Sequence, residues 1–282
     1  MQEGQASRTA DRVAERRAGH QVRDRPLVFE DPLALRIIRP EVAKELRERP
    51  PARESSPLAP YLRAFFAMRS RFAEDALRDA VGRGVRQYVI LGAGFDTFAY
   101  RNPFTGLRVF EVDHPATQAT KRERLVSGEI AIPSALTFVP IDFTVTALND
   151  ALREAGFDTS APAFFAWLGV VPYLERPAID QTLSFIASLP RGTGVVFDYT
   201  VPPETLGMTS RVVFYAMAKR VASLGEPWKT FFDPKELLRD LHRLGFTNVE
   251  DCDGDALNRR FFADRSDGLK VGAAGHMAMA SV

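Results

Sequence analysis

Short apolar runs alternate with segments of helical spacing from residue 85 to residue 200, and this alternation constrains the fold more than any other feature. The apolar runs predict strands at 85–91, 107–113, 136–142, 163–168 and 194–200. Between the later strands, residues 115–126, 145–155 and 176–188 are each able to form a crossover helix. Strands that are apolar throughout and alternate with helices indicate a mainly parallel sheet covered on both faces. The sequence therefore predicts an α/β fold.

Helical patterns flank this core on both sides. Residues 7 to about 80 read as helix, with apolar groups at helical spacing from Pro32 and again along residues 61–77. Acidic residues at 11, 15 and 24 alternate with the arginines of residues 8–25, which predicts a solvated helix face rather than a phosphate-binding patch. We therefore expect an N-terminal helical cap over residues 1–80 and a core over residues 81–282.

The C-terminal part of the chain carries clearer helix boundaries. Residues 201–232 look like a helical insertion that belongs to the cap. A helix should then begin at Pro234 after the capping residue Asp233 and end at Gly245. Two further strands are expected at 246–250 and 276–282, which brings the sheet to seven strands.

Composition and charge exclude several functions. Lys and Arg number 37 against 36 Asp and Glu, so no basic excess indicates a nucleic-acid or anionic-membrane partner. The single cysteine, Cys252, excludes an intrachain disulfide and argues against a cysteine-based metal site, and we expect no metal. The charged N-terminal segment lacks the apolar stretch of a secretory signal. No window approaches the roughly 18 apolar residues of a membrane span. We expect a cytoplasmic protein.

The first strand runs into a turn with two glycines, V-I-L-G-A-G-F-D-T, residues 89–97. In an open parallel sheet, ligands bind beyond the carboxyl ends of the strands, where glycines let backbone N–H groups approach closely. The chain has no Gly-Lys-Ser or Gly-Lys-Thr, which excludes a phosphate-binding P-loop. A dinucleotide site would place a third glycine at position 97, and this chain has Thr97, which counts against NAD without excluding it.

An acid follows the glycine turn at the spacing of a nucleoside site. Asp113 ends the next strand, 21 residues after Gly92, where its oxygens can accept hydrogen bonds from a ribose diol. Asp96, inside the turn, is interpreted as turn support rather than a ligand contact. The pair Gly92 and Asp113 indicates an adenosine ligand without saying what is attached to it.

Several segments together resemble the S-adenosylmethionine-dependent methyltransferases of the leucine carboxyl methyltransferase type. The segments occur in family order: R-S-R-F (69–72), G-V-R-Q-Y-V-I-L-G-A-G-F-D-T-F-A-Y-R (84–101), V-F-E-V-D-H-P (109–115), a lysine within 119–122, V-P-I-D-F (139–143) and W-L-G-V-V-P-Y-L (167–174). The resemblance spans roughly residues 8–200 and implies a Rossmann-like class I methyltransferase core with S-adenosylmethionine as its cofactor.

The resemblance also implies a cofactor site. The turn formed by Gly92, Ala93 and Gly94 would approach the methionine part of the cofactor, and Arg69 would pair with its carboxylate. Asp113 would hold the ribose. The adenine would lie between Asp142 and Phe143, with Asp142 accepting from its exocyclic amine. The residues alone leave an alternative open for each of two positions: Arg69 as an ordinary surface cation, and Asp142 as the cap of the helix that follows.

Four further residues are candidates for the predicted site. His114 is counted with the cofactor residues, as a packing or stacking group rather than a base. Leu168 departs from the family pattern, because the protein-modifying members carry an acid before this glycine; backbone or apolar packing against the cofactor would replace that contact. Tyr173 is the candidate catalytic residue, positioned to orient the acceptor by a hydrogen bond, and Tyr199 is a weaker candidate. Both tyrosines are open to the alternative that they pack beneath the cap with a satisfied hydroxyl.

The family chemistry requires little of the protein. A nucleophile held in line with the methyl–sulfur bond reacts by direct displacement, so proximity and orientation supply most of the catalysis. A hydroxyl acceptor would need a general base, and none is evident; this mildly favours a carboxyl group or an acidic or phenolic hydroxyl.

Aromatic residues of the cap would line an apolar acceptor pocket, although most of them could pack in the core instead: Phe65, Phe66, Phe214, Tyr215, Trp228, Phe231 and Phe232. We therefore expect an O-methyltransferase acting on a small molecule. The alternatives are a nicotinamide-dependent oxidoreductase and a non-catalytic cofactor-binding module. The sequence leaves the oligomeric state open, with a homodimer as one candidate.

Overall fold

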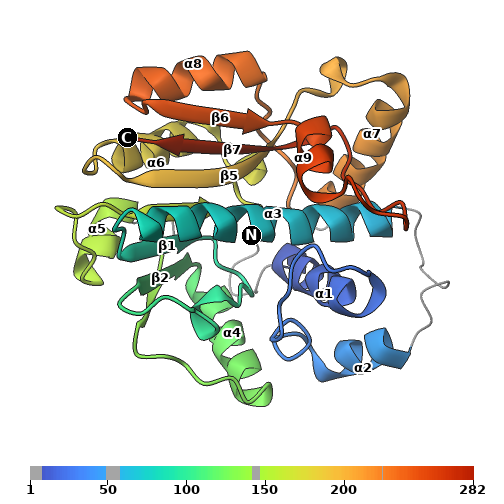
Figure 1. The fold of residues 1–282 in the computed structure, drawn as a ribbon, viewed down its shortest axis with the longest axis horizontal. Coiled ribbons are helices and arrows are strands. Elements are labelled where there is room, and N and C mark those ends of the chain that lie inside the picture. Colours follow the sequence, from blue (N-terminus) through green and yellow to red (C-terminus); the bar gives the residue numbers. More distant parts are fainter. Residues whose placement is uncertain (1–7, 49–57, 142–146, 224) are drawn as a thin grey trace.

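A computed structural model describes residues 8–48, 58–141, 147–223 and 225–282 of the 282-residue chain. Within these ranges the strands form one seven-stranded sheet in the order β3-β2-β1-β4-β5-β7-β6 (Figure 1). Their bounds are β1 Gln87–Leu91, β2 Arg108–Asp113, β3 Leu136–Pro140, β4 Phe164–Trp167, β5 Gly194–Thr200, β6 Asn248–Cys252 and β7 Gly275–Ser281. The order reverses between β1 and β4, which is where ligands bind in open sheets of this kind.

The first five strands are parallel, and β7 inserts antiparallel between β5 and β6. Every residue of β1, β4 and β5 is buried, as expected for strands covered on both faces. The mainly parallel seven-stranded sheet that the sequence predicts is confirmed. The carboxyl ends of β1, β2, β4 and β5 meet at one edge, and this edge carries the candidate site.

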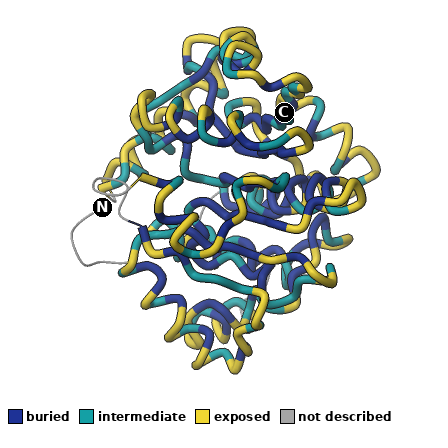
Figure 2. Tube along the Cα trace, turned by 90° about the vertical axis from the view of Figure 1, so that its left-hand side faces the viewer, coloured by how far each residue is buried: buried dark blue, intermediate teal, exposed yellow. Residues whose placement is uncertain are grey.

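Helices cover both faces of the sheet, and buried residues concentrate in the layers between them (Figure 2). The helices are α1 Arg8–Arg23, α2 Pro40–Glu48, α3 Ala59–Gly82, α4 Pro115–Ser127, α5 Leu148–Glu154, α6 Arg176–Ala187, α7 Met208–Ala222, α8 Pro234–Leu244 and α9 Gly254–Phe261. One apolar cluster joins the strands to α5, α6 and α8, and a second joins them to α3 and α9. Among the described residues, none of the helices is both long enough and apolar enough to cross a membrane.

The N-terminal helices lie beside the carboxyl edge of the sheet (Figure 1). Helix α3 packs directly on the sheet, since its buried residues share a cluster with β1, whereas α1 and α2 form a third cluster with residues 33–38 and α4. Helix α7 lies in the predicted 201–232 insertion. The division into a cap over residues 1–80 and a core over 81–282 remains a prediction.

The expected helix beginning at Pro32 is wrong. Residues 32–36 form turns, and the next helix begins at Pro40. Asp31 explains the difference, because one carboxylate oxygen accepts from the N–H of Leu33 at 3.1 Å while the other accepts from the Thr97 hydroxyl at 2.7 Å. Ala34, Ile37 and Ile38 of this segment are buried in the cluster that α1 shares, and its backbone hydrogen bonds form turns, such as that from the N–H of Arg36 to the carbonyl of Leu33 at 2.9 Å. Helix α9 was not predicted from the sequence.

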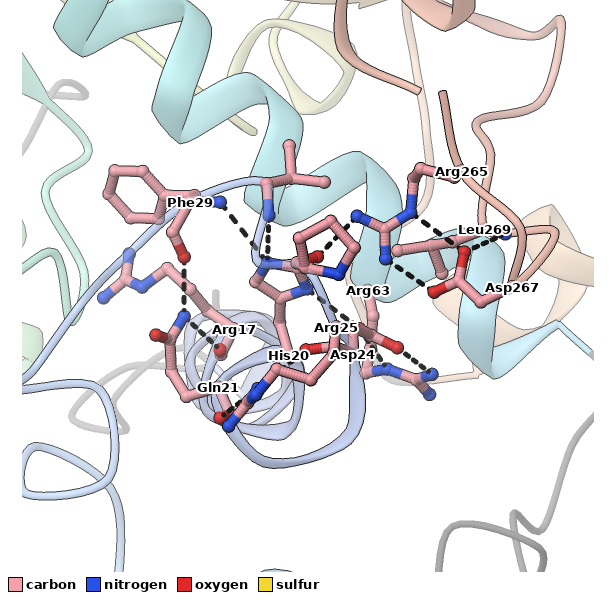
Figure 3. Close-up of polar contacts among 12 residues, drawn as sticks. Arg17, His20, Gln21, Asp24, Arg25, Phe29, Arg63, Arg265, Asp267 and Leu269 are labelled. Carbon is pink, nitrogen blue, oxygen red and sulfur yellow. Dashed lines mark hydrogen bonds and ion pairs between the residues drawn. The ribbon is translucent and has the colours of Figure 1, made fainter. Parts of the chain in front are cut away.

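The N-terminal arginines are not all on a solvated face, as the sequence suggested. Arg17 is 5% exposed and donates to the carbonyl of Phe95 at 2.7 Å, in the loop after the glycine turn. Asp24 is also buried and accepts two hydrogen bonds from Arg63 of α3, at 3.0 and 2.9 Å (Figure 3). These buried contacts hold α1 against α3 and against the edge of the sheet.

Candidate active site

The two-glycine turn is tied to the end of β2. The N–H groups of Gly92 and Ala93 both donate to the carbonyl of Val112, at 2.8 and 3.0 Å. Gly92 has a φ of +66° and Gly94 a φ of +47°, a region that side chains with a Cβ rarely adopt. A Cβ on Gly92 would lie 2.3 Å from Cγ2 of Val170, so the turn after β1 and the turn after β4 are in contact.

Asp113 lies where a nucleoside site requires a carboxylate. Its Oδ2 accepts from the N–H of Gly94 at 2.5 Å, and its Oδ1 accepts from the N–H of His114 at 2.7 Å. Burial raises the pKa of Asp113, although these two hydrogen bonds act in the opposite direction. His114 caps α4, since its Nδ1 accepts from the N–H of Ala116 at 3.2 Å.

Two other sequence features have structural roles. Asp96 accepts from the N–H of Phe98 at 2.7 Å, which confirms that it supports the turn. Lys121, the lysine within 119–122, is buried and pairs with Glu111 at 2.7 Å, while Tyr100 donates to the same carboxylate at 3.2 Å. Burial raises the pKa of Glu111 to about 7 despite Lys121. Neither residue of this pair lines the cavity described below.

A buried ion pair lies beyond the turn after β4. Arg69 of α3 is 7% exposed and donates from Nη1 to Oδ2 of Asp198 at 3.1 Å. Oδ1 of Asp198 accepts from the N–H of Gly169 at 2.5 Å. The alternative that Arg69 is a surface cation is therefore wrong. Sequence reasoning missed Asp198, although a carboxylate near the end of a buried apolar strand is the signal that identified Asp113.

A cavity of about 880 Å³ opens at this ion pair. Arg69, Gly169, Tyr173 and Asp198 line it where the strands end. Its other walls come from α1, α2, α3, α7 and residues 270–275. The aromatic side chains in its wall are Tyr61, Phe65, Phe66, Tyr199, Phe214 and Trp228. Its size and aromatic lining suit a small organic molecule.

Several expected cavity residues lie elsewhere. Phe231 and Phe232 pack with the first apolar cluster, and Tyr215 is 53% exposed on α7. Tyr199 reaches the cavity wall, but its hydroxyl donates to Oδ1 of Asp251 at 2.7 Å. That contact confirms the packing interpretation of Tyr199.

Of the remaining predicted residues, the structure describes Tyr173 and Leu168 but not Asp142 and Phe143. Tyr173 is half-buried in a short 3-10 turn, Val171–Tyr173; burial raises its pKa, and a hydrogen bond with Trp228 acts in the opposite direction. Leu168 is half-buried and packs with the second apolar cluster. Asp142 and Phe143 lie outside the described residues.

Comparison with known proteins identifies the family of this chain. The sequence pattern of the leucine carboxyl methyltransferase family matches residues 10–187. The chain belongs to the leucine carboxyl methyltransferase family. A Bacillus subtilis protein named as an S-adenosyl-L-methionine-dependent methyltransferase, YktD, is 35% identical over 300 residues, which cover 96% of each chain. A Mycobacteroides abscessus protein with the same description is 36% identical over 176 residues, covering 61% of this chain and 57% of the relative.

The fold has solved counterparts as well. A DUF574-family protein from Streptomyces avermitilis superimposes with a TM-score of 0.54 at 16% identity, covering 95% of this chain and 96% of that one. The chain is thus an S-adenosylmethionine-dependent methyltransferase with a Rossmann-like fold. The nicotinamide-dependent oxidoreductase and the non-catalytic module are set aside.

The residues present fit this cofactor. The carboxylate of Asp113 is fixed beside the N–H of Gly94, as binding of a ribose diol requires. The buried pair of Arg69 and Asp198 offers charges of both signs, and the cofactor's methionine part carries both. When bound, the cofactor supplies a methyl group already activated by the sulfonium.

Proposed function

We propose that this methyltransferase transfers the methyl group to a carboxyl or hydroxyl oxygen of a small molecule. The observation that carries the proposal is the cavity of about 880 Å³, which is lined by Gly169 and Arg69 near the end of β4 and has several aromatic side chains in its wall. Pockets for small organic molecules are of this size and composition. The protein's contribution is to exclude water and to hold the acceptor oxygen in line.

In this proposal Gly92, Ala93, Gly94, Asp113 and Arg69 bind the cofactor, with His114 and Leu168 packing beside it. Asp142 and Phe143 would flank its adenine. Tyr173 orients the acceptor. Tyr173 lines the cavity, where its hydroxyl would donate to an oxygen of the acceptor. A cytoplasmic location, the lack of nucleic-acid and membrane partners, and a homodimer remain predictions.

The test is transfer of a labelled methyl group. Incubation with methyl-labelled S-adenosylmethionine and panels of aromatic carboxylic acids and phenols should label at least one acceptor. Alkali then distinguishes the two chemistries, because a methyl ester is hydrolysed and a methyl ether is not. Labelling confined to protein or nucleic acid in a cell extract would contradict the proposal.

A matched pair of tyrosine variants tests the role of Tyr173. We expect Tyr173→Phe to lower kcat/KM for the acceptor by roughly 10- to 100-fold, the effect of losing one positioned hydrogen bond. Affinity for S-adenosylhomocysteine should stay the same. Tyr215→Phe removes an exposed hydroxyl outside the cavity and should change neither quantity. Normal turnover in Tyr173→Phe would contradict the role of Tyr173.

A further inference from the structure

Asp198 is a buried carboxylate with no residue role of its own in the function proposed above. It lies near the carboxyl end of β5, is 5% exposed, and forms part of the cavity wall. Its two oxygens accept one hydrogen bond each, from Gly169 and from Arg69. A carboxylate offers about four acceptor positions, so two positions remain for a ligand.

The partner of Asp198 is held rigidly. The guanidinium of Arg69 lies on the surface of Gly169, where an added Cβ would come within 2.8 Å of both Nη atoms. The same guanidinium stacks on the ring of Phe66, with 4.7 Å from its carbon to the ring centroid. Arg69 has five N–H donors, and among the described residues its one hydrogen bond goes to Asp198. Donors therefore remain for a ligand carboxylate.

We propose that Asp198 and Arg69 together bind the amino-acid end of the cofactor, with Asp198 accepting from the α-ammonium and Arg69 donating to the α-carboxylate. This inference rests on the proposed placement of Arg69 in the cofactor site. An arginine alone would attract the carboxylate but repel the ammonium and sulfonium of the same molecule. Adding a fixed carboxylate removes that conflict, because each ligand charge then meets its opposite.

The position of Asp198 also accounts for the departure at Leu168. Trp167, the last residue of β4, pairs with Phe197 of β5, so Leu168, just past the end of β4, follows beside Asp198 of β5. Leu168 occupies the place where an acid was expected from the resemblance. Asp198 supplies a carboxylate one strand further along the same edge, and the N–H of Gly169 fixes its orientation.

Ligand analogues test the assignment without measuring catalysis. The probes are S-adenosylhomocysteine, its analogue lacking the α-amino group, its decarboxylated analogue, and 5′-methylthioadenosine, which lacks the amino-acid end. Calorimetry should show that Asp198→Asn weakens binding of the two ammonium-containing ligands by at least about tenfold, the contribution of a hydrogen bond to a charged group. Affinity for the other two ligands should change by less than about threefold.

Two controls make the result specific. Asp251→Asn changes a carboxylate outside the cavity wall and should leave all four affinities unchanged. If Asp198→Asn does not fold, the affinities of the wild type alone test the inference. The wild type should then bind S-adenosylhomocysteine at least about tenfold more tightly than the des-amino analogue.

The outcomes separate this inference from the function on which it rests. An equal loss for S-adenosylhomocysteine and its des-amino analogue in Asp198→Asn would reduce Asp198 to a structural support and overturn the inference. Equal wild-type affinity for these two ligands would overturn it as well. Failure of the wild type to bind any of the four adenosyl ligands would instead contradict the whole cofactor site.

Discussion

Asp24 in the N-terminal region is a buried carboxylate, although the sequence pattern assigned it to a solvated helix face. His20 is fully buried; its Nδ1 lies 2.8 Å from Oδ2 of Asp24, and its Nε2 accepts from the N–H groups of Val28 and Phe29 (Figure 3). These bonds require a neutral ring with the proton on Nδ1. His20 therefore joins α1 to the segment that follows it. Asp24 binds both His20 of α1 and Arg63 of α3, and so joins these two helices.

Asp24 should make stability depend on pH in the acid range. Burial by itself would raise the pKa of Asp24, but hydrogen bonds from His20 and Arg63 outweigh it and hold the pKa below its usual value. A lowered pKa in the folded state contributes stability above the unfolded-state pKa of about 4, and this contribution is lost as the pH falls below that value.

We expect Asp24→Asn to lower the free energy of unfolding by about 3 kcal/mol at pH 7, because a buried charge pair is broken. The difference from wild type should shrink as the pH falls below about 4. Urea denaturation across this range measures it. A constant difference at all pH values would show that the charge of Asp24 has no part in the effect.

At the scale of elements, the contact between the turns after β1 and β4 builds the site. Gly92 and Gly245 both have positive φ, but their surroundings differ: a Cβ at Gly92 meets Val170 at 2.3 Å, whereas a Cβ at Gly245 meets nothing within 4 Å. The two glycines are therefore a matched pair: alanine at either position would strain the backbone, but only alanine at Gly92 would also collide with Val170.

Gly245→Ala should cost about 1 kcal/mol of stability, the strain of a left-handed residue, and leave binding of S-adenosylhomocysteine unchanged. Gly92→Ala should cost about 2–5 kcal/mol, since overpacking adds to the strain. It should also weaken S-adenosylhomocysteine binding at least tenfold by displacing the turn. Denaturation and calorimetry measure both quantities. Equal effects of the two substitutions would show that the contact with Val170 is unimportant.

Elements with a local signal were predictable from the sequence, and contacts between distant residues were not. The helix at 234–244 has its cap at Asp233, Pro234 at its first position and a left-handed Gly245 at its end, as expected. The segment after Pro32 has helical spacing, yet Asp31 holds it in turns through Thr97, 66 residues away. The pair of Arg69 and Asp198 joins residues 129 positions apart, which no local pattern reveals. The glycine turn and Asp113 were predictable because parallel strands end at one edge.

At the scale of the whole molecule, the cavity beside Arg69 and Asp198 lies between parts of the chain that are distant in sequence. Helix α1 and residues 270–275 both contribute to its wall. Arg265 lies in the loop between α9 and residues 270–275. It donates to the carbonyl of Pro26, in the segment after α1, at 2.5 Å and pairs with Asp267 at 2.5 Å. The cofactor turn, in contrast, depends on contacts among β1, β2 and the turn after β4.

Arg265→Ala should therefore loosen the N-terminal segment beside the cavity without disturbing the glycine turn. We expect the N-terminal segment to be cleaved several-fold faster in limited proteolysis, because its link to the C-terminal loop is lost and local opening becomes easier. Affinity for S-adenosylhomocysteine should stay within about twofold of wild type. Arg239→Ala, which removes an exposed cation on α8, is the control and should change neither. A parallel loss of cofactor affinity in Arg265→Ala would mean that the N-terminal segment and the glycine turn are not separable in this way.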